Sequence, residues 1–365
     1  MKVAITGGHG FLGWHTACRL RARYGVDAVR LGRDDTADPS RLADALADVD
    51  TVLHLAGVNR AETDDEVEQG NVVAAEALAK ALDGRPVHVV HANSRHHDQD
   101  TAYGRGKRRA AEILRGLPGT TADLVLPNLF GEHGRPAYNS FVATFCHEVA
   151  TGGAPEVKVD ATVPLLHAQD AAQALLEAAV HRHDDSRDVA GIDHRVSDVL
   201  ERVQGFHELY AGRGDVPDLS DAFSVDLFNT YRAALFPTGL PFTVDAHADA
   251  RGRLVEGVRA HGGPGQVYVS TTHPGRTRGD HYHLRKVERF FVVAGEAEIA
   301  LRRLLHDEVV TFRVSGDAPA YVDMPTLWVH NIRNVGNDEL VTVFWSNQLL
   351  DRDDPDQYPE EVTPA

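Results

Sequence analysis

The stretch Lys2-Val-Ala-Ile-Thr6-Gly7-Gly-His-Gly10-Phe-Leu-Gly13 decides how the first half of the chain folds. Its first five residues predict a short buried strand. The glycines that follow at a spacing of three suit a tight turn, a close backbone approach to a pyrophosphate, and close packing of a helix on the strand. The helix that begins there offers its N-terminal amides to the anion. The stretch therefore predicts a dinucleotide-binding turn.

Strands and helices alternate outward from this stretch. Further strands are expected at residues 27–31, 51–56, 86–90 and 122–126, and helical segments separate them. This alternation predicts an α/β Rossmann-like fold, a doubly wound parallel sheet with helices on its faces.

A serine, a tyrosine and a lysine follow at a spacing that suggests catalysis. Tyr103 and Lys107 are four positions apart on a predicted helix, so their polar ends lie on one face, and Ser94 ends the preceding strand. An ammonium beside a phenol favours the phenolate, so we expect Lys107 to lower the pKa of Tyr103. Ser94 would orient a substrate carbonyl. On its own this spacing also occurs on ordinary surface helices, and it gains weight from the dinucleotide-binding turn.

The cofactor is expected to be NADPH. The second strand ends in the apolar Leu31, and Arg33 follows where it can meet a 2′-phosphate. The residues expected at the cofactor are Gly7, Gly10, Phe11, Leu12, Gly13, Arg33, Leu55, Ala56, Gly57, Tyr103 and Lys107.

The substrate is expected beyond the carboxyl ends of the strands, as in other sheets of this type. Asn128, Arg135 and Asn139 follow the strand at 122–126 and are the candidate substrate-binding residues. His91, His96 and His97 also lie near the site. No carboxylate or cysteine accompanies them at ligand spacing, so we interpret them as loop residues.

The second half of the chain has a different pattern. Short alternating strands without helices follow the segment Phe236-Pro-Thr-Gly-Leu-Pro-Phe242, which predicts a linker and then an all-β barrel. We expect residues 1–240 to form the NAD(P)-binding domain with its sugar-nucleotide-binding part. Residues 241–350 would form the barrel, and residues 351–365 a loosely held acidic tail.

The barrel contains a candidate metal site. His281 and His283 point to one face of a strand, Glu288 follows on the next strand, and His330 comes from a later turn. Three imidazoles and a carboxylate suit one divalent metal, with zinc expected and iron, manganese or nickel also compatible. A single strand histidine would more often be structural.

Bulk composition limits the possible partners. The 365 residues are 42% hydrophobic and carry a net charge of −17, which argues against nucleic acid or an anionic membrane. Only Cys18 and Cys146 are present, so no disulfide framework is expected. Without an expected signal peptide or membrane span, the sequence predicts a cytoplasmic protein.

Both halves resemble known families. The glycine turn with Ser94, Tyr103 and Lys107 is similar to the extended short-chain dehydrogenases/reductases (SDRs). Gly275, His281, His283, Glu288 and Gly295 match the first cupin motif. The second cupin motif is matched by Pro325, His330 and Asn334, but Leu327 stands where that family usually has glycine.

The whole chain resembles the CapF family of bifunctional capsular polysaccharide enzymes. Shared segments include His54-Leu-Ala-Gly-Val-Asn-Arg60, Pro127-Asn-Leu-Phe-Gly131 and Tyr138-Asn-Ser140. Where that family tends to have serine or arginine, this chain has Ala92, Asn93, Gly106 and Val125. The resemblance implies C3 epimerisation by the cupin and NADPH-dependent reduction of the C4 ketone by the SDR domain. The implied substrate is a UDP-2-acetamido-2,6-dideoxy-4-ketohexose, on the way to UDP-N-acetyl-L-fucosamine.

Three points stay open at this level. Tyr282, His247 and Glu256 are all candidates for the epimerisation base. The nucleotide can be UDP or dTDP, and the chain can be a 4-ketoreductase of another deoxysugar nucleotide with a structural cupin. A non-catalytic NAD(P) sensor is a further alternative, although a sensor has no need of the proton-transfer residues. A homodimer, formed through the cupin domain, is expected.

Overall fold

The structure, a computed structural model, describes residues 1–363 and contains two compact units. The first unit comprises Met1–Phe130 and Ala161–Arg195. The second comprises Gly131–Asp160 together with the chain from Val196 onward. The helices of residues 196–240 are thus grouped with the barrel and not with the first sheet.

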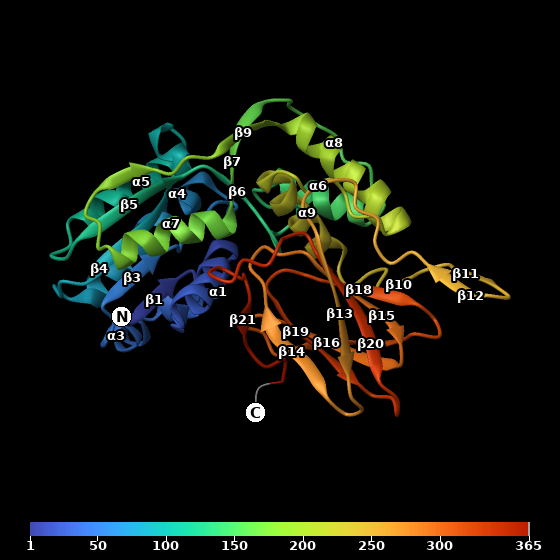
Figure 1. Cartoon of the computed structure of the whole chain (residues 1–365). Helices are drawn as coiled ribbons and strands as arrows, with labels where there is room; N and C mark the ends of the chain where they lie inside the picture. Colours follow the sequence, from blue (N-terminus) through green and yellow to red (C-terminus); the bar gives the residue numbers. More distant parts are fainter. Residues whose placement is uncertain (364–365) are drawn as a thin grey trace. The chain divides into compact units, whose positions relative to one another are not determined.

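The first unit is built on a six-stranded parallel sheet (Figure 1). In spatial order its strands are β2 (Val29–Leu31), β1 (Val3–Thr6), β3 (Thr51–His54), β4 (His88–Ser94), β5 (Thr121–Leu126) and β8 (Ser186–Asp188). This confirms the doubly wound sheet. The strand order reverses between β1 and β3, and ligands of such sheets bind at that point, outside the carboxyl ends of the strands.

Helices pack on this sheet in pairs, with α1 against α7 and α4 against α5. Apolar side chains of α3, α4 and α5 and of the sheet form one buried core, which includes Leu46, Leu78, Val89 and Leu114. The helices are α1 (Phe11–Tyr24), α2 (Arg33–Ala37), α3 (Pro39–Leu46), α4 (Asp64–Leu82), α5 (Ala102–Arg115) and α7 (Ala168–Val180), with a 3₁₀ turn at Arg95–Asp98. A small second sheet joins β6 (Asn128–Phe130), β7 (Thr162–His167) and β9 (Ile192–Arg195).

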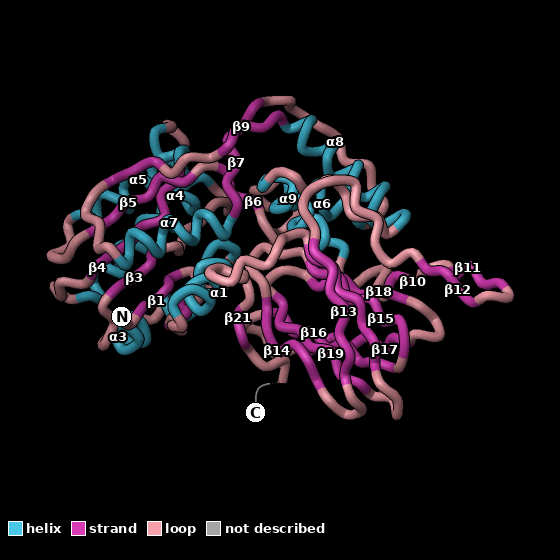
Figure 2. The backbone as a smooth tube through the Cα atoms, viewed as in Figure 1, coloured by secondary structure: helices cyan, strands magenta, loops and turns pink. Residues whose placement is uncertain are grey.

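The second unit contains two five-stranded antiparallel sheets, and Figure 2 shows how strands dominate it. One sheet has the order β10 (Phe242–Thr243), β18 (Ala320–Met324), β15 (Glu288–Ala294), β20 (Leu340–Ser346) and β13 (Gln266–Thr272). The other has the order β17 (Val309–Ser315), β16 (Glu296–Arg303), β19 (Trp328–Asn334), β14 (Thr277–Tyr282) and β21 (Tyr358–Pro359). Phe290, Ile299, Val322 and Ile332 come from both sheets into one core, as the expected β barrel requires.

The remaining elements of the second unit are one hairpin and several helices. The hairpin is formed by β11 (Ala246–Asp249) and β12 (Gly252–Val255). The helices are α6 (Phe141–Ala150), α8 (Val196–Phe206) and α9 (Ala222–Leu235), with a π-helical turn at His207–Ala211. Helix α6 packs against both α8 and α9.

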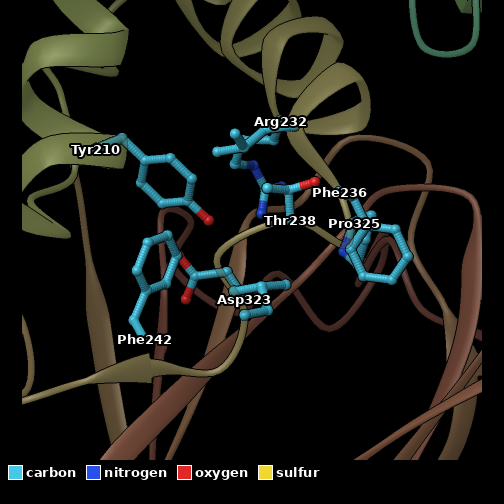
Figure 3. Close-up of a pocket in the computed structure, with 9 residues that line it drawn as sticks. Tyr210, Arg232, Phe236, Thr238, Phe242, Asp323 and Pro325 are labelled. Carbon is cyan, nitrogen blue, oxygen red and sulfur yellow. The ribbon is translucent and has the colours of Figure 1, made fainter. Parts of the chain in front are cut away.

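The segment 236–242, which was expected to be a linker, packs against the barrel. The ring of Phe236 lies 4.6 Å from that of Trp328, and Phe236 and Leu240 border the barrel core. Figure 3 shows the small pocket that this segment lines together with Tyr210, Arg232 and Asp323. The segment is therefore part of the second unit's packing and not a free connector.

The expectation of a loosely held tail is wrong for the residues described, 351–363. Val362 is 1% exposed, and its carbonyl accepts a hydrogen bond from Arg302 at 2.7 Å. Residues Tyr358–Pro359 pair with β14, and Asp356 binds the loop after that strand. Acidic composition suggested mobility, but specific backbone and arginine contacts order this segment.

Among residues 1–363, no helix is both long enough and apolar enough to cross a membrane.

Candidate active sites

The glycine turn after β1 forms an anion-binding end of helix α1. Gly7 has φ +69°, and a Cβ at this position would lie 2.9 Å from the Ala56 nitrogen, so the turn needs glycine. Gly10 donates its N–H to the Gly7 carbonyl at 2.9 Å and caps the helix. Phe11, Leu12 and Gly13 form an uncharged first turn. The N-terminal amides of α1 can therefore receive a pyrophosphate.

The loops after β2 and β3 flank this turn. The Leu55 N–H bonds the Thr6 carbonyl at 3.1 Å, which joins the ends of β3 and β1, and Ala56 and Gly57 continue from there. Arg33 is exposed at the start of α2. Its neighbour Asp35 uses its carboxylate to accept the Gly32 N–H at 2.8 Å. Arg33 is thus placed as a cation beside the loop after β2.

Ser94 and Tyr103 meet as expected. Ser94 is the last residue of β4, Tyr103 lies in the first turn of α5, and their side chains are hydrogen-bonded. The expected direction of the Tyr103 pKa is wrong. Burial raises the pKa of Tyr103, and the hydrogen bond with Ser94 lowers it less than burial raises it. Tyr103 therefore holds its proton at neutral pH and can act as a proton donor.

Lys107 is anchored to strand β4. Its ammonium donates to the Ala92 carbonyl at 2.6 Å and to His91 Nε2 at 3.1 Å. Burial lowers the pKa of Lys107 to about 8, and the charge of Asp123 opposes this shift. These contacts could not be expected from the sequence, because His91 and Ala92 lie 16 and 15 positions before Lys107 and meet it only when α5 packs on β4.

His91 is not a loop residue, which corrects the expectation from sequence. It lies inside β4 and is 1% exposed, whereas His96 and His97 lie in the 3₁₀ turn Arg95–Asp98. His91 and its partner Asp123 are residues that the sequence reasoning missed. The available signal was a histidine and an aspartate within otherwise apolar strands.

The expected substrate residues are distributed over both units. Asn128 is exposed on β6 in the first unit. In the second unit the Arg135 guanidinium lies 4.9 Å from the centre of the Tyr138 ring, and Asn139 adopts φ +58° just before α6. Their joint role in substrate binding stays a prediction.

The four expected metal ligands converge in the barrel. His281 on β14 pairs with His330 on β19, and Glu288 begins β15 in the other sheet. The candidate ligand atoms of these three residues and His283 all lie within 4.8 Å of one another. Glu288 Oε2 is 3.1 Å from His283 Nε2, 3.4 Å from His330 Nε2 and 3.9 Å from His281 Nε2.

The chemistry of this cluster fits a divalent cation. Burial lowers the pKa of His330 to about 4, so its imidazole is neutral at pH 7, as a ligand must be. Burial alone would raise the pKa of Glu288, but the three histidines hold it well below its ordinary value, so the carboxylate is ionised. The buried His330 Nε2 has no hydrogen-bond partner within residues 1–363. Neutral imidazoles and one carboxylate match zinc or a similar ion.

Two further features hold the cluster in place. His283 Nδ1 bonds the carbonyl of Asp356, which leaves Nε2 toward Glu288, and the Asp356 carboxylate accepts the N–H groups of residues 284–286 at 2.8–2.9 Å. Leu327 donates its N–H to the His283 carbonyl at 2.8 Å and adopts φ +63°. Glycine adopts this left-handed conformation without strain, whereas leucine pays about 1–2 kcal/mol.

The structure narrows the choice of epimerisation base. Tyr282 is 2% exposed and stacks on Tyr358, on the opposite face of β14 from His281 and His283. His247 lies on the projecting β11–β12 hairpin, which Figure 1 shows well away from β14 and β19, and the exposed Glu256 follows it. Tyr268 on β13, which the sequence reasoning missed, is close enough to Glu288 for that charge, after burial, to raise its pKa.

Comparison with known proteins matches both halves of the chain. The NAD dependent epimerase/dehydratase family matches residues 3–190, and the polysaccharide biosynthesis C-terminal domain matches residues 247–358. A UDP-2-acetamido-2,6-beta-L-arabino-hexul-4-ose reductase of Pseudomonas aeruginosa is 31% identical over 367 residues and covers 98% of both chains.

Solved structures are similar over the same length. The capsular polysaccharide assembling protein CapF of Staphylococcus aureus is 29% identical, with a TM-score of 0.62 over 99% of this chain and 100% of that one. CapF with the inhibitor 3-isopropenyl-tropolone is 27% identical, with a TM-score of 0.56 over the same shares. The chain therefore belongs to the NAD dependent epimerase/dehydratase family and, within it, to the CapF-like enzymes that carry a polysaccharide biosynthesis C-terminal domain.

Proposed function

We propose that this enzyme converts a UDP-2-acetamido-2,6-dideoxy-4-ketohexose in two steps, C3 epimerisation in the barrel and NADPH-dependent reduction of the C4 ketone in the first unit. One observation carries the proposal. A single chain holds both a Ser94–Tyr103 pair beside a dinucleotide-binding turn and a four-ligand cluster, and it aligns end to end with a UDP-sugar reductase.

In the reductive step, bound NADPH supplies the hydride to C4. Tyr103 then donates its phenolic proton to the oxygen that gains charge, which its raised pKa permits because the phenol is protonated at pH 7. Ser94 holds the carbonyl against Tyr103. Lys107 uses its one remaining N–H for the nicotinamide ribose or Tyr103. Arg33, beside the loop after β2, favours the 2′-phosphate of NADPH over the bare ribose of NADH.

In the epimerisation step, His281, His283, Glu288 and His330 would hold one divalent ion, with zinc the preferred ion. Such an ion supplies Lewis-acid polarisation of the 4-keto oxygen, which makes the C3 proton more acidic. Of the polar side chains on the inner face of β13, we assign to Tyr268 the donation of the proton that C3 receives after its own proton has been removed. Burial and the charge of Glu288 raise the pKa of Tyr268, against a hydrogen bond with Ser346 that lowers it, so the phenol carries the proton that it donates.

The proposed homodimer forms through the barrel. Strand β13 is at the edge of its sheet, and Val267 and Val269 on its outward face are 60% and 65% exposed. An edge strand with outward valines favours pairing with a second copy.

A panel of 4-keto sugar nucleotides tests this function. The purified enzyme is offered UDP- and dTDP-linked 4-keto deoxysugars while NADPH absorbance is followed, and products are identified by NMR. We expect rapid oxidation with the UDP-2-acetamido-2,6-dideoxy ketohexose and inversion at C3. NADPH oxidation without inversion at C3 would contradict the proposed epimerisation and leave the barrel with a structural role. Oxidation of none of the panel would contradict the reductase assignment.

A further inference from the structure

Lys107 is held by a histidine that lies outside the serine, tyrosine and lysine of the reductase site. His91 Nε2 and the Ala92 carbonyl receive two hydrogen bonds from the Lys107 ammonium. An ammonium has three N–H donors, so one remains available. The strand thus fixes the lysine while leaving a single donor for the cofactor or Tyr103.

Asp123 on β5 determines how His91 can act. The Asp123 Oδ1 atom lies 2.8 Å from His91 Nδ1. An ionised carboxylate only accepts, so the proton is on Nδ1, and Nε2 has a free lone pair for Lys107. The other oxygen, Oδ2, accepts from Asn93 at 3.1 Å, Arg115 at 3.0 Å and Ser186 at 3.2 Å. The carboxylate is therefore fixed from four sides.

The three side chains of this arrangement are buried, and burial sets their protonation states. Asp123, His91 and Lys107 are 2%, 1% and 5% exposed. Burial, and then Lys107, lower the pKa of His91 to about 4, so His91 is a neutral acceptor throughout the working pH range. Burial would raise the pKa of Asp123, but the bond from His91 and the neighbouring donors lower it to about 2. The other titratable groups around Lys107 are His54 on β3, neutral because burial holds its pKa well down, Tyr103 on α5, and Arg115 beyond Asp123.

We propose that Asp123 and His91 form a buried hydrogen-bonded relay that positions Lys107 and keeps it an ammonium with one N–H free for the nicotinamide ribose or Tyr103. Asp123 and His91 are positioning residues, since they act through Lys107. This inference rests on the proposed role of Lys107 in NADPH-dependent reduction. It adds His91 on β4 and Asp123 on β5 to the residues that the reduction requires.

The test compares His91→Phe with His88→Phe in the full-length enzyme. His88 is a matched control because it is buried in the same strand, where it bonds Thr120 and the Ala178 carbonyl instead of Lys107. Two readouts are recorded against pH: the Kd for NADPH from its fluorescence, and kcat/KM for the ketosugar. Both are repeated with Asp123→Asn, which removes the charge, and with His91→Gln, whose amide oxygen can still accept from Lys107.

Without the imidazole acceptor, the buried ammonium of Lys107 is less favourable. We expect His91→Phe and Asp123→Asn to move the alkaline limit of NADPH binding and of kcat/KM to a pH lower by about one unit. On the alkaline side, NADPH affinity and kcat/KM should each fall roughly tenfold. His91→Gln should recover most of this shift, and His88→Phe should leave the limit unchanged.

An unshifted alkaline limit in His91→Phe, or an equal shift in His88→Phe, would overturn the proposal. If His91→Phe does not fold, Asp123→Asn and His91→Gln decide by the same comparison. A wild-type enzyme that binds NADPH but reduces no ketosugar would contradict the proposed function alone, because the NADPH-binding profiles would still decide on His91.

Discussion

The two candidate sites of this chain are assembled in different ways. In the barrel, four side chains from β14, β15, β19 and the loop after β14 already lie within 4.8 Å of one another. In the first unit, Ser94 and Tyr103 are hydrogen-bonded, whereas Lys107 bonds β4 through Ala92 and His91. The candidate ligands of the barrel site contact one another directly, whereas the reductase site depends on a chain of buried partners.

This difference has a physical origin. Residues two apart in an extended segment face the same side, so His281 on β14 and His283, directly after β14, converge through local backbone geometry. Ser94 ends β4 and Tyr103 and Lys107 lie on α5, whereas the partners of Lys107 come from β4 and the partner of His91 comes from β5. We therefore expect substitutions of the barrel cluster to lower metal binding directly. Substitutions in the first unit should act by changing the protonation of Lys107.

The largest expected effect is loss of the metal. The double variant His281→Ala, His283→Ala removes two of four ligands, so we expect less than about a tenth of an equivalent of metal after purification. His281 and His283 are not part of the hydrophobic core of the barrel, which includes Phe290 and Ile332, so the variant should stay folded. Elemental analysis and circular dichroism measure the two quantities. Wild-type protein that cannot be loaded with zinc would contradict the metal site itself.

The next effect concerns Lys107 and stability. Its folded-state pKa of about 8 is below the ordinary value of 10.5, so between these pH values the unfolded state binds more protons. The free energy of unfolding therefore rises with pH in this window, by about 3 kcal/mol relative to Lys107→Met. Urea unfolding of both proteins at pH 7 and pH 10 measures the difference. If the free energies of unfolding of wild type and Lys107→Met differ by the same amount at pH 7 and pH 10, Lys107 is not buried as a charge.

A smaller effect is expected from the segment that braces the metal site. Asp356→Asn replaces an acceptor of backbone N–H groups by an amide donor, so the loop that carries His283 should loosen. Changes around metal ligands typically cost about 10–100-fold in metal affinity. Competition with a chromophoric chelator gives the Kd for zinc, and Asp353→Asn, an exposed residue of the same segment, is the matched control. Equal affinities in both variants would mean that the tail does not hold the site.

The smallest effect is expected at Arg33. Because this side chain is exposed, its attraction to a 2′-phosphate is weakened by solvent, and Arg33→Ala should reduce the preference for NADPH over NADH only about three- to tenfold. Steady-state kinetics with both cofactors provide the ratio. Wild-type enzyme that uses NADH as efficiently as NADPH would remove the basis for assigning Arg33 this role.

The sequence predicted what local spacing determines. The parallel sheet, the glycine turn, the proximity of Ser94 and Tyr103 and the convergence of three histidines with Glu288 all follow from period and position along the chain. Leu327, which stands where the cupin family usually has glycine, adopts φ +63°, a conformation that the sequence analysis did not predict.

What the sequence could not predict depends on contacts between distant segments. The sequence suggests a loop at His91 because its partner Asp123 lies 32 positions away. It suggests a loosely held tail because acidic composition does not reveal that Asp356 caps the loop of His283. The expected lowering of the Tyr103 pKa is wrong because burial of the phenol outweighs its hydrogen bond with Ser94, and the ammonium of Lys107 bonds Ala92 and His91.

Hydrogen exchange tests most directly whether the two sites work independently on one ketosugar. Tyr103→Phe removes the proton donor of the first unit without touching the barrel, and a general acid contributes about 10²–10⁴-fold. The variant is given the ketosugar and NADPH in deuterated water. We predict that NADPH oxidation is abolished while deuterium still enters at C3. Loss of the exchange in a variant that binds NADPH normally would contradict this independence.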